Sequence, residues 1–198
     1  MKNTILLLLL LVSISMQAKY FSGTLTFADG KTKSGLVSTP NADNSVDYKE
    51  NEDAAEEKIE GKLLTAIDIL HPDGSKDVYV NLYTEKAKKK VLRPKSWFKS
   101  MHRGGKVNFL AAEKTDAVGI DAPKVEYYFQ NSANDYATPF FANNSDGTPA
   151  TQDADTYKKQ IKLNLKKACP ILYKNSEAGA IVIKDMTELI EAYKTTCG

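Results

Sequence analysis

The stretch YFSGTLTFADGKTKSGLVS, residues 20–38, decides the fold, because it carries the pattern of a complete β-hairpin. Phe21, Leu25 and Phe27 alternate with small polar residues, so one face of the first strand is apolar and the other is polar. Asp29-Gly30 supplies the positive φ that a tight hairpin turn requires. The stretch therefore predicts two antiparallel strands, the second of them over residues 31–38.

The same pattern returns in LTAIDILHPDGSKDVYVNLYTE, residues 64–85. Ile67 and Ile69 lie on one face of the expected strand, a Pro-Asp-Gly turn follows, and Val78, Val80 and Leu82 alternate with polar and aromatic residues on the way back. A short strand is also expected at 46–49. Hairpins of one design predict an antiparallel β meander or partly open barrel, covering a β-rich domain at 19–130.

The pattern between residues 86 and 152 is mixed. Strands are expected at 106–112 and 124–130, where apolar and aromatic residues are dense. PKSWFKSMHRGG, residues 94–105, predicts a short helix that Ser96 caps and the glycine pair ends. Its apolar face would comprise Trp97, Phe98 and Met101. Residues 131–152 show no periodicity and predict a loop or linker.

Residues 153–198 predict a helical segment that packs on the β domain, which makes the fold class α+β. Asp153 or Asp155 caps a first helix, and Pro170 opens a second one. Asp185 with Glu188 forms a capping pattern before a third helix. The apolar stripe of the first helix comprises Tyr157, Ile161, Leu165 and Ala168. The residues expected to face the sheet from the later helices are Ile171, Leu172, Leu189, Ile190 and Tyr193.

Cys169 and Cys197 are the two cysteines of the chain. A small, even number of cysteines in an exported protein is typical of a structural disulfide. A zinc site would need four ligands at suitable spacing, and His71 and His102 lie in no ligand pattern. We expect a bond between Cys169 and Cys197, with free thiols or a bond between two chains as alternatives. No metal and no cofactor are expected.

The leader MKNTILLLLLLVSISMQAKYF, residues 1–21, has the three parts of a secretory signal peptide. Lys2 provides the charge, residues 5–12 provide the apolar run, and small or polar residues follow. This run is too short for a bilayer core, which needs about 20 apolar residues. Cleavage is expected after Ala18, or else after Gln17. The mature chain is then exported to the periplasm or the extracellular space, without a transmembrane segment.

The overall charge is nearly balanced, with 27 basic and 25 acidic residues, so no general affinity for nucleic acid or for an anionic membrane is expected. Six of the bases lie within residues 86–95, and seven acids lie within residues 47–60. The basic run is either a solvated surface or an anion-binding site. Its candidate residues are Lys88, Lys89, Lys90, Arg93 and Lys95. Nothing aromatic is interleaved with them, so stacking on bases has no support.

The sequence contains no nucleophile elbow, Gly-rich phosphate loop or zinc-protease helix. Asp116, Asp121 and Glu126 do not form a recognisable pair of catalytic carboxylates, since spacing alone does not identify one. We therefore expect a non-catalytic interaction domain of the envelope or extracellular space, whose partner is an unknown protein or small ligand. One alternative is a carrier of a small apolar ligand, and another is a hydrolase with an unrecognised site.

Several stretches carry a family resemblance: the leader, GTLTFADGKTKSGLV, WFKSMHRGGKVNFLAAE, VEYYFQ, and the tail from ACPILY to IKDMTELIEAYKTTC. Together they resemble a family of uncharacterised exported proteins of Bacteroidota, in which β-hairpins precede a cysteine-containing helical tail. The resemblance covers most of the mature chain. It implies an exported location and this architecture, and it implies no activity.

Overall fold

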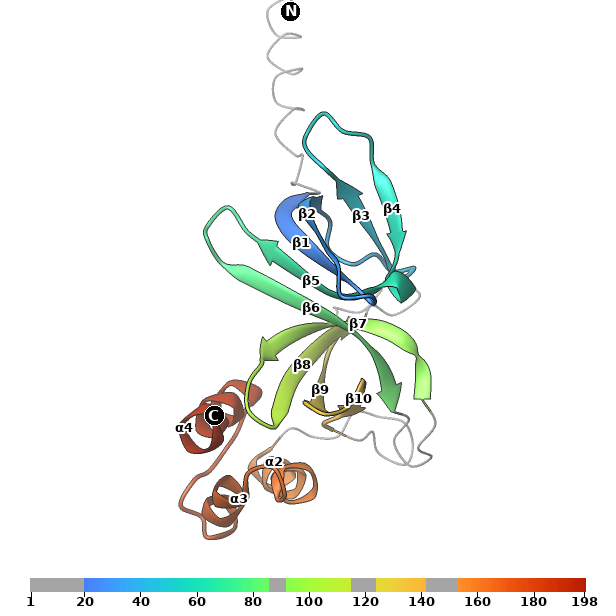
Figure 1. The fold of residues 1–198 in the computed structure, drawn as a ribbon. Coiled ribbons are helices and arrows are strands. Elements are labelled where there is room, and N and C mark those ends of the chain that lie inside the picture. Colours follow the sequence, from blue (N-terminus) through green and yellow to red (C-terminus); the bar gives the residue numbers. More distant parts are fainter. Residues whose placement is uncertain (1–19, 86–91, 115–123, 142–152) are drawn as a thin grey trace, which may run out of the picture. The chain divides into compact units, whose positions relative to one another are not determined.

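The computed structural model describes residues 20–85, 92–114, 124–141 and 153–198 (Figure 1). It confirms an α+β chain, in which strands come first and short helices follow. The first strands are β1 Phe21–Phe27, β2 Thr32–Val37, β3 Ser45–Lys49, β4 Glu57–Glu60 and β5 Leu64–Leu70, with the 3₁₀ turn η2 Gly61–Leu63 before β5. The later strands are β6 Lys76–Glu85, β7 Leu92–His102, β8 Val107–Lys114, β9 Lys124–Asn131 and β10 Tyr136–Pro139. The helices are α2 Ala154–Gln160, η3 Ile161–Leu165, α3 Pro170–Glu177 and α4 Met186–Cys197.

The chain divides into two compact units, unit 1 up to Asp77 and unit 2 from Val78 onward. In unit 1 the strand order is β5-β1-β2-β3-β4, with antiparallel neighbours throughout. The two expected turns are confirmed, since Gly30 has φ 84° and Gly74 has φ 83°. The acidic stretch at 47–60 contributes to a hairpin, because β3 and β4 pair across it.

Two glycines let β1 and β2 approach their neighbours closely. Gly23 lies opposite Gly35 in the register of the two strands. A Cβ on Gly23 would lie 2.3 Å from Val37 Cγ2, and one on Gly35 would lie 2.5 Å from the carbonyl oxygen of Lys49. Side chains at these positions would therefore force the strands apart. The core of the unit comprises Leu25, Val37, Val46, Tyr48, Ile59, Leu64, Ile67 and Ile69.

Unit 2 contains a closed five-stranded barrel, in the order β6-β7-β8-β9-β10 and back to β6. Successive strands of a meander alternate in direction, so the first and fifth strands run the same way. Closure therefore requires a parallel pair, and β10 does pair with β6 in parallel, with Tyr136 opposite Tyr83 and Ala137 opposite Thr84. The expected antiparallel meander or partly open barrel is thus confirmed, and a short parallel pair joins its first and last strands within this unit.

Side chains of the strands themselves fill the barrel. The rings of Phe98 and Tyr128 meet edge to face, with centroids 4.8 Å apart. Val80 lies opposite Phe98, and Leu110 lies opposite Tyr128, in the registers of their strands. All four of these side chains are buried. The barrel interior is therefore a packed core.

The prediction of a helix at 94–105 is wrong, because most of this segment belongs to strand β7, which ends at His102. β7 pairs with β6 on one side and with β8 on the other. Pairing on both sides outweighs a local helical pattern, since sheet neighbours supply both the backbone hydrogen bonds and the burial of Phe98. Met101, expected on the apolar helix face, is 36 % exposed. The glycine pair makes the β7–β8 turn, with φ 146° at Gly104 and 67° at Gly105.

The loop expected at 131–152 contains strand β10. This strand has only four residues and includes Pro139, so its local pattern is weak. Its position comes from closure of the barrel, where it joins β9 to β6. Residues 142–152 lie outside the described residues.

The helical tail covers the outer face of the barrel at β8. Phe109 and Leu110 are neighbours on β8 and are both fully buried, because Leu110 lies on the side of Tyr128 and Phe109 contacts the tail. The ring of Phe109 packs edge to face on Tyr193 of α4, at 5.3 Å between centroids, and on Phe140, at 6.4 Å. The expected packing of the tail on β structure is therefore seen within unit 2.

The buried stripe of the first tail helix has an unusual period. Its side chains follow one another every four residues, as Tyr157, Ile161, Leu165 and Cys169. A regular α-helix turns by about 100° per residue, so this spacing would drift by about 40° at each step. The π-helical segment η3 at Ile161–Leu165 has wider turns, which keep the stripe facing the core.

The predicted helix starts are confirmed. Asp153 caps α2 by accepting from the Thr156 amide, and Asp185 caps α4 by accepting from the Glu188 amide. One expectation is wrong: Ile171 is 57 % exposed, and only its neighbour Leu172 is buried. Ile171 lies in the first turn of α3, on the side of the helix that turns away from the core.

Cys169 and Cys197 form the expected disulfide, with their Cα atoms 5.7 Å apart. The bond joins the residue before α3 to the last residue of α4. It closes the part of the chain that contains both helices. Cys169 is fully buried among the tail residues, so the disulfide is part of the packed core.

Candidate functional site

Unit 1 has an open hollow of about 460 Å³ between the β2–β3 loop and the residues around η2. We call it the Asp43 hollow. Its lining is polar or charged and consists of Asp43, Asn44, Ser45, Lys58, Glu60, Gly61 and Lys62. Acidic and basic side chains both contribute, so the hollow presents charges of both signs.

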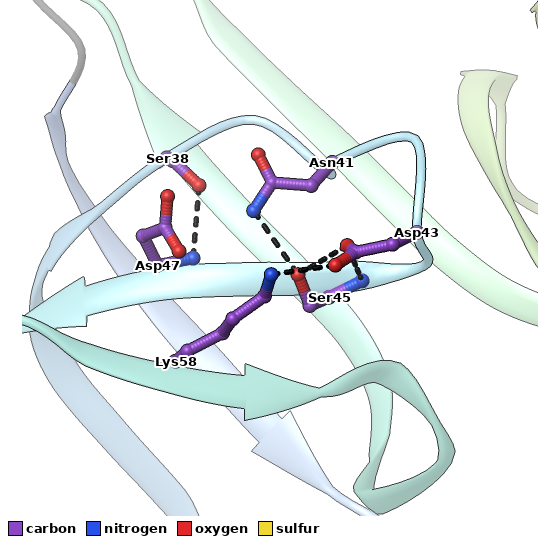
Figure 2. Close-up of polar contacts among 6 residues, drawn as sticks. All are labelled: Ser38, Asn41, Asp43, Ser45, Asp47 and Lys58. Atoms are coloured by element: carbon purple, nitrogen blue, oxygen red, sulfur yellow. Dashed lines mark hydrogen bonds and ion pairs between the residues drawn. The ribbon is translucent and has the colours of Figure 1, made fainter.

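Hydrogen bonds within the β2–β3 loop hold one wall of this hollow in place (Figure 2). The Asp43 carboxylate accepts from the Ser45 amide at 3.1 Å and from the Ser45 hydroxyl at 2.5 Å. The Asn41 side-chain amide donates to the same hydroxyl at 3.1 Å. At the base of the loop, the Ser38 hydroxyl accepts from the Asp47 amide at 3.0 Å. The wall is therefore preorganised by the loop itself.

The second wall begins at η2 and requires a glycine. Asn44 adopts the left-handed conformation, with φ 65°, and its carbonyl oxygen points toward Gly61. A Cβ on Gly61 would lie 2.1 Å from that oxygen, which no side chain tolerates. Lys62 and Glu60, on either side of Gly61, form an ion pair at the rim. Close approach of the two backbones thus defines the shape of the hollow.

An ion pair joins the two walls. Lys58 Nζ lies 2.5 Å from Asp43 Oδ2, and both side chains are more than half exposed. The hydrogen bond from Lys58, with those from Ser45, lowers the pKa of Asp43 to about 2. The hydrogen bond with Asp43 in turn raises the pKa of Lys58. Asp43 is therefore fully ionised at neutral pH.

The titration of Asp43 should show this pairing. Because the pKa of Asp43 is lowered in the folded protein, its ionised form stabilises the loop at pH values above 3.8, the ordinary pKa of the group. This stabilisation is lost as the pH falls through about 2. We expect the Asp43 carboxyl carbon, followed by NMR, to titrate near 2 and to move toward 3.8 in Lys58→Ala. A wild-type midpoint at 3.8 would show that the ion pair does not persist in solution.

The hollow lacks the groups of a hydrolytic site. Ser45 is its hydroxyl side chain, and this hydroxyl donates a hydrogen bond to Asp43, which is a weak base because its pKa is about 2. No histidine lines it. Among the described residues, no group of three or more His, Cys, Asp or Glu side chains could hold a metal ion. The arrangement is suited to recognising a polar, charged surface.

Neither histidine lines this hollow. His71 Nε2 lies 3.0 Å from Asp77 Oδ2, and its ring packs on Phe21 at 4.8 Å. The nearby Ser75 hydroxyl donates to Asp73, so it is not aligned with His71 as a nucleophile. His102 packs against Tyr193 at 5.9 Å, where burial and then the Lys194 charge lower its pKa, opposed by Glu191.

One of the three acidic candidates, Glu126, lies in the described part of the chain. The Glu126 carboxylate accepts from the Tyr128 hydroxyl at 2.6 Å, and burial and this bond raise the pKa of Tyr128. Asp116 and Asp121 lie outside the described residues. Of the three acidic candidates, the described part of the chain therefore contains Glu126 alone.

The basic run is only partly described. Lys88, Lys89 and Lys90 lie outside the described residues. Arg93 and Lys95 begin strand β7, where Arg93 is exposed and Lys95 Nζ lies 5.2 Å from the centre of the Tyr83 ring. Lys95 thus stabilises its own strand pair, and the proposed anion site stays a prediction.

The basic run should not bind nucleic acid tightly. We expect no tight binding to DNA, because the net charge is nearly balanced and nothing aromatic is interleaved with the basic residues. Replacing Lys88, Lys89 and Lys90 by alanine should therefore remove no high-affinity binding. The measurement is fluorescence anisotropy of labelled DNA at low and physiological salt. Tight, salt-dependent binding that disappears in this variant would contradict the prediction.

The Asp43 hollow was missed from the sequence. The local signal was present, because Asn-Ala-Asp-Asn-Ser is typical of a turn with side chain to backbone bonds. A turn alone does not predict a hollow. Lys58 and Gly61 follow the loop at a distance in sequence and join it only through the β3–β4 pairing.

The chain was also compared with known proteins. No protein-family model matches it, and no curated protein or solved structure matches it either. The function must therefore be inferred from the geometry of the described residues.

Proposed function

We propose that the protein is an exported, non-catalytic interaction domain that recognises a polar segment of a partner protein at the Asp43 hollow. The observation that carries this proposal is the preorganised recess itself. Its charged groups are exposed and already held by hydrogen bonds, so binding would cost little ordering of the loop. Carboxylates and ammonium groups side by side suit a partner that presents both signs of charge.

Export is part of the proposal. The leader at 1–18 lies outside the described residues, and its three-part pattern is the first support. A buried disulfide is the second, because such bonds persist in oxidising compartments. No helix in the described part of the chain is long and apolar enough to span a membrane. N-terminal sequencing of protein from the native host should find a start at or beside Lys19, and an intact Met1 would contradict export.

The carrier and hydrolase alternatives have less support. A carrier needs space for its ligand, and the side chains of Phe98, Leu110 and Tyr128 are buried inside the barrel, where such a ligand would lie. A hydrolase needs a nucleophile beside an effective base, whereas the Ser45 and Ser75 hydroxyls donate to Asp43 and Asp73, whose lowered pKa values make them weak bases. Recognition without catalysis fits these contacts best.

A charge reversal tests the proposal. Asp43→Arg removes the ion pair and places a cation in the hollow, whereas Asp29→Arg is a matched control on another exposed Asp–Lys pair. Tagged variants would be recovered from the native envelope after mild cross-linking. A partner recovered with wild type and Asp29→Arg but not with Asp43→Arg is expected. Equal recovery with all three, or loss with both variants, would overturn the proposal.

A further inference from the structure

The first tail helix has a second face that the packing of unit 2 does not use. Residues 154–169 contain five lysines and one aspartate, although the whole chain is nearly neutral. The lysines all lie away from the buried stripe of Tyr157, Ile161 and Leu165. They are Lys158, Lys159, Lys162, Lys166 and Lys167, and all except the half-buried Lys158 are exposed.

An apolar side chain stands in the middle of these cations. Leu163 is 66 % exposed and follows Lys162 directly, while Lys159, Lys166 and Lys167 lie one turn before or after it. Ile171, at the start of the adjacent helix α3, is 57 % exposed. Both apolar side chains are directed to solvent, so they gain nothing from the core of unit 2.

The contacts that these lysines make within unit 2 leave their positive charges available to a ligand. Lys158 Nζ donates to the carbonyl oxygen of Glu177, and Lys166 Nζ lies 5.1 Å from the centre of the Tyr173 ring. Neither partner neutralises the positive charge. Asp155, the acid of this segment, lies in the first turn, away from the lysines at its other end.

We propose that this lysine face, with Leu163 at its centre, docks on a membrane surface that contains anionic phospholipid. Lysines on one side of an amphipathic helix are attracted to anionic headgroups, and an exposed leucine among them inserts at the acyl boundary. Nucleic acid would use the charge but would give Leu163 no apolar partner. A peripheral contact of this kind needs no membrane-spanning helix, and it does not depend on the Asp43 hollow.

The test is flotation of the full chain with lipid vesicles. Wild type is expected to bind vesicles of phosphatidylcholine with about 30 % phosphatidylglycerol and not pure phosphatidylcholine, and to dissociate when NaCl rises from about 50 to about 500 mM. The triple variant Lys162→Gln, Lys166→Gln, Lys167→Gln should bind the vesicles that contain phosphatidylglycerol about tenfold more weakly, or weaker still. Every variant keeps the same N-terminus, so any binding by the leader is common to all.

The matched control removes the same charge elsewhere. Lys31→Gln, Lys76→Gln, Lys106→Gln changes three exposed lysines outside both the lysine face and the Asp43 hollow, and should leave vesicle binding within about twofold. Leu163→Ser should reduce binding while circular dichroism and the melting temperature stay unchanged. Absence of wild-type binding, or equal loss in the control triple, would overturn the proposal. The proposal would also be overturned if the protein bound duplex DNA more tightly than the vesicles and Leu163→Ser changed neither affinity.

Discussion

Replacing Phe109 by alanine is expected to destabilise unit 2 by roughly 3 to 5 kcal/mol, the usual range for a fully buried phenylalanine. Its ring lies between the β-barrel and the tail and contacts Phe140, Tyr193 and His102. Truncation removes these contacts and leaves a cavity at the joint between β8 and α4. Urea denaturation followed by tyrosine fluorescence and by circular dichroism would measure the loss.

Leu163→Ala is the control for this change, because Leu163 is an exposed apolar residue of the same unit. Its effect should stay within about 0.5 kcal/mol. If Phe109→Ala were equally mild, then the tail would not pack on β8 in solution.

Removing the disulfide is the second large change. Cys169 and Cys197 are separated by 28 residues, and closing a loop of that size stabilises a fold by roughly 3 to 4 kcal/mol in the chain-entropy model. The double variant Cys169→Ala, Cys197→Ala should lose roughly 2 to 5 kcal/mol, and α4 should lose most of its protection against hydrogen exchange. Amides of β1 and β2 in unit 1 should keep theirs.

Mass spectrometry under non-reducing conditions provides the control for this prediction. Exported wild-type protein should contain no free thiols and no disulfide bond between chains. Two free thiols, or a dimer linked through cysteine, would contradict the internal bond.

The elements that could be predicted from the sequence are those with local chemistry of their own. The Asp-Gly turns at Gly30 and Gly74 and the caps at Asp153 and Asp185 each depend on a few neighbouring residues. The disulfide was predictable because two cysteines leave a single internal pairing.

The elements that could not be predicted depend on residues distant in sequence. β7 has a helical pattern in Trp97 and Phe98 but becomes a strand because β6 and β8 pair with it on both sides. β10 is too short for a pattern and exists because five strands close a barrel. The Asp43 hollow needs Lys58 and Gly61 to arrive beside the loop through sheet pairing.

Site-specific photo-crosslinking in the native host tests most directly the central claim, that the Asp43 hollow recognises a partner protein. A photo-reactive residue at Lys62 lies on the rim of the hollow, and the same residue at Lys31 lies on the exposed β1–β2 turn as a control. We predict a discrete adduct of higher mass from position 62 only, which disappears when Asp43→Arg is added. No adduct from position 62, or the same adduct from both positions, would contradict the claim.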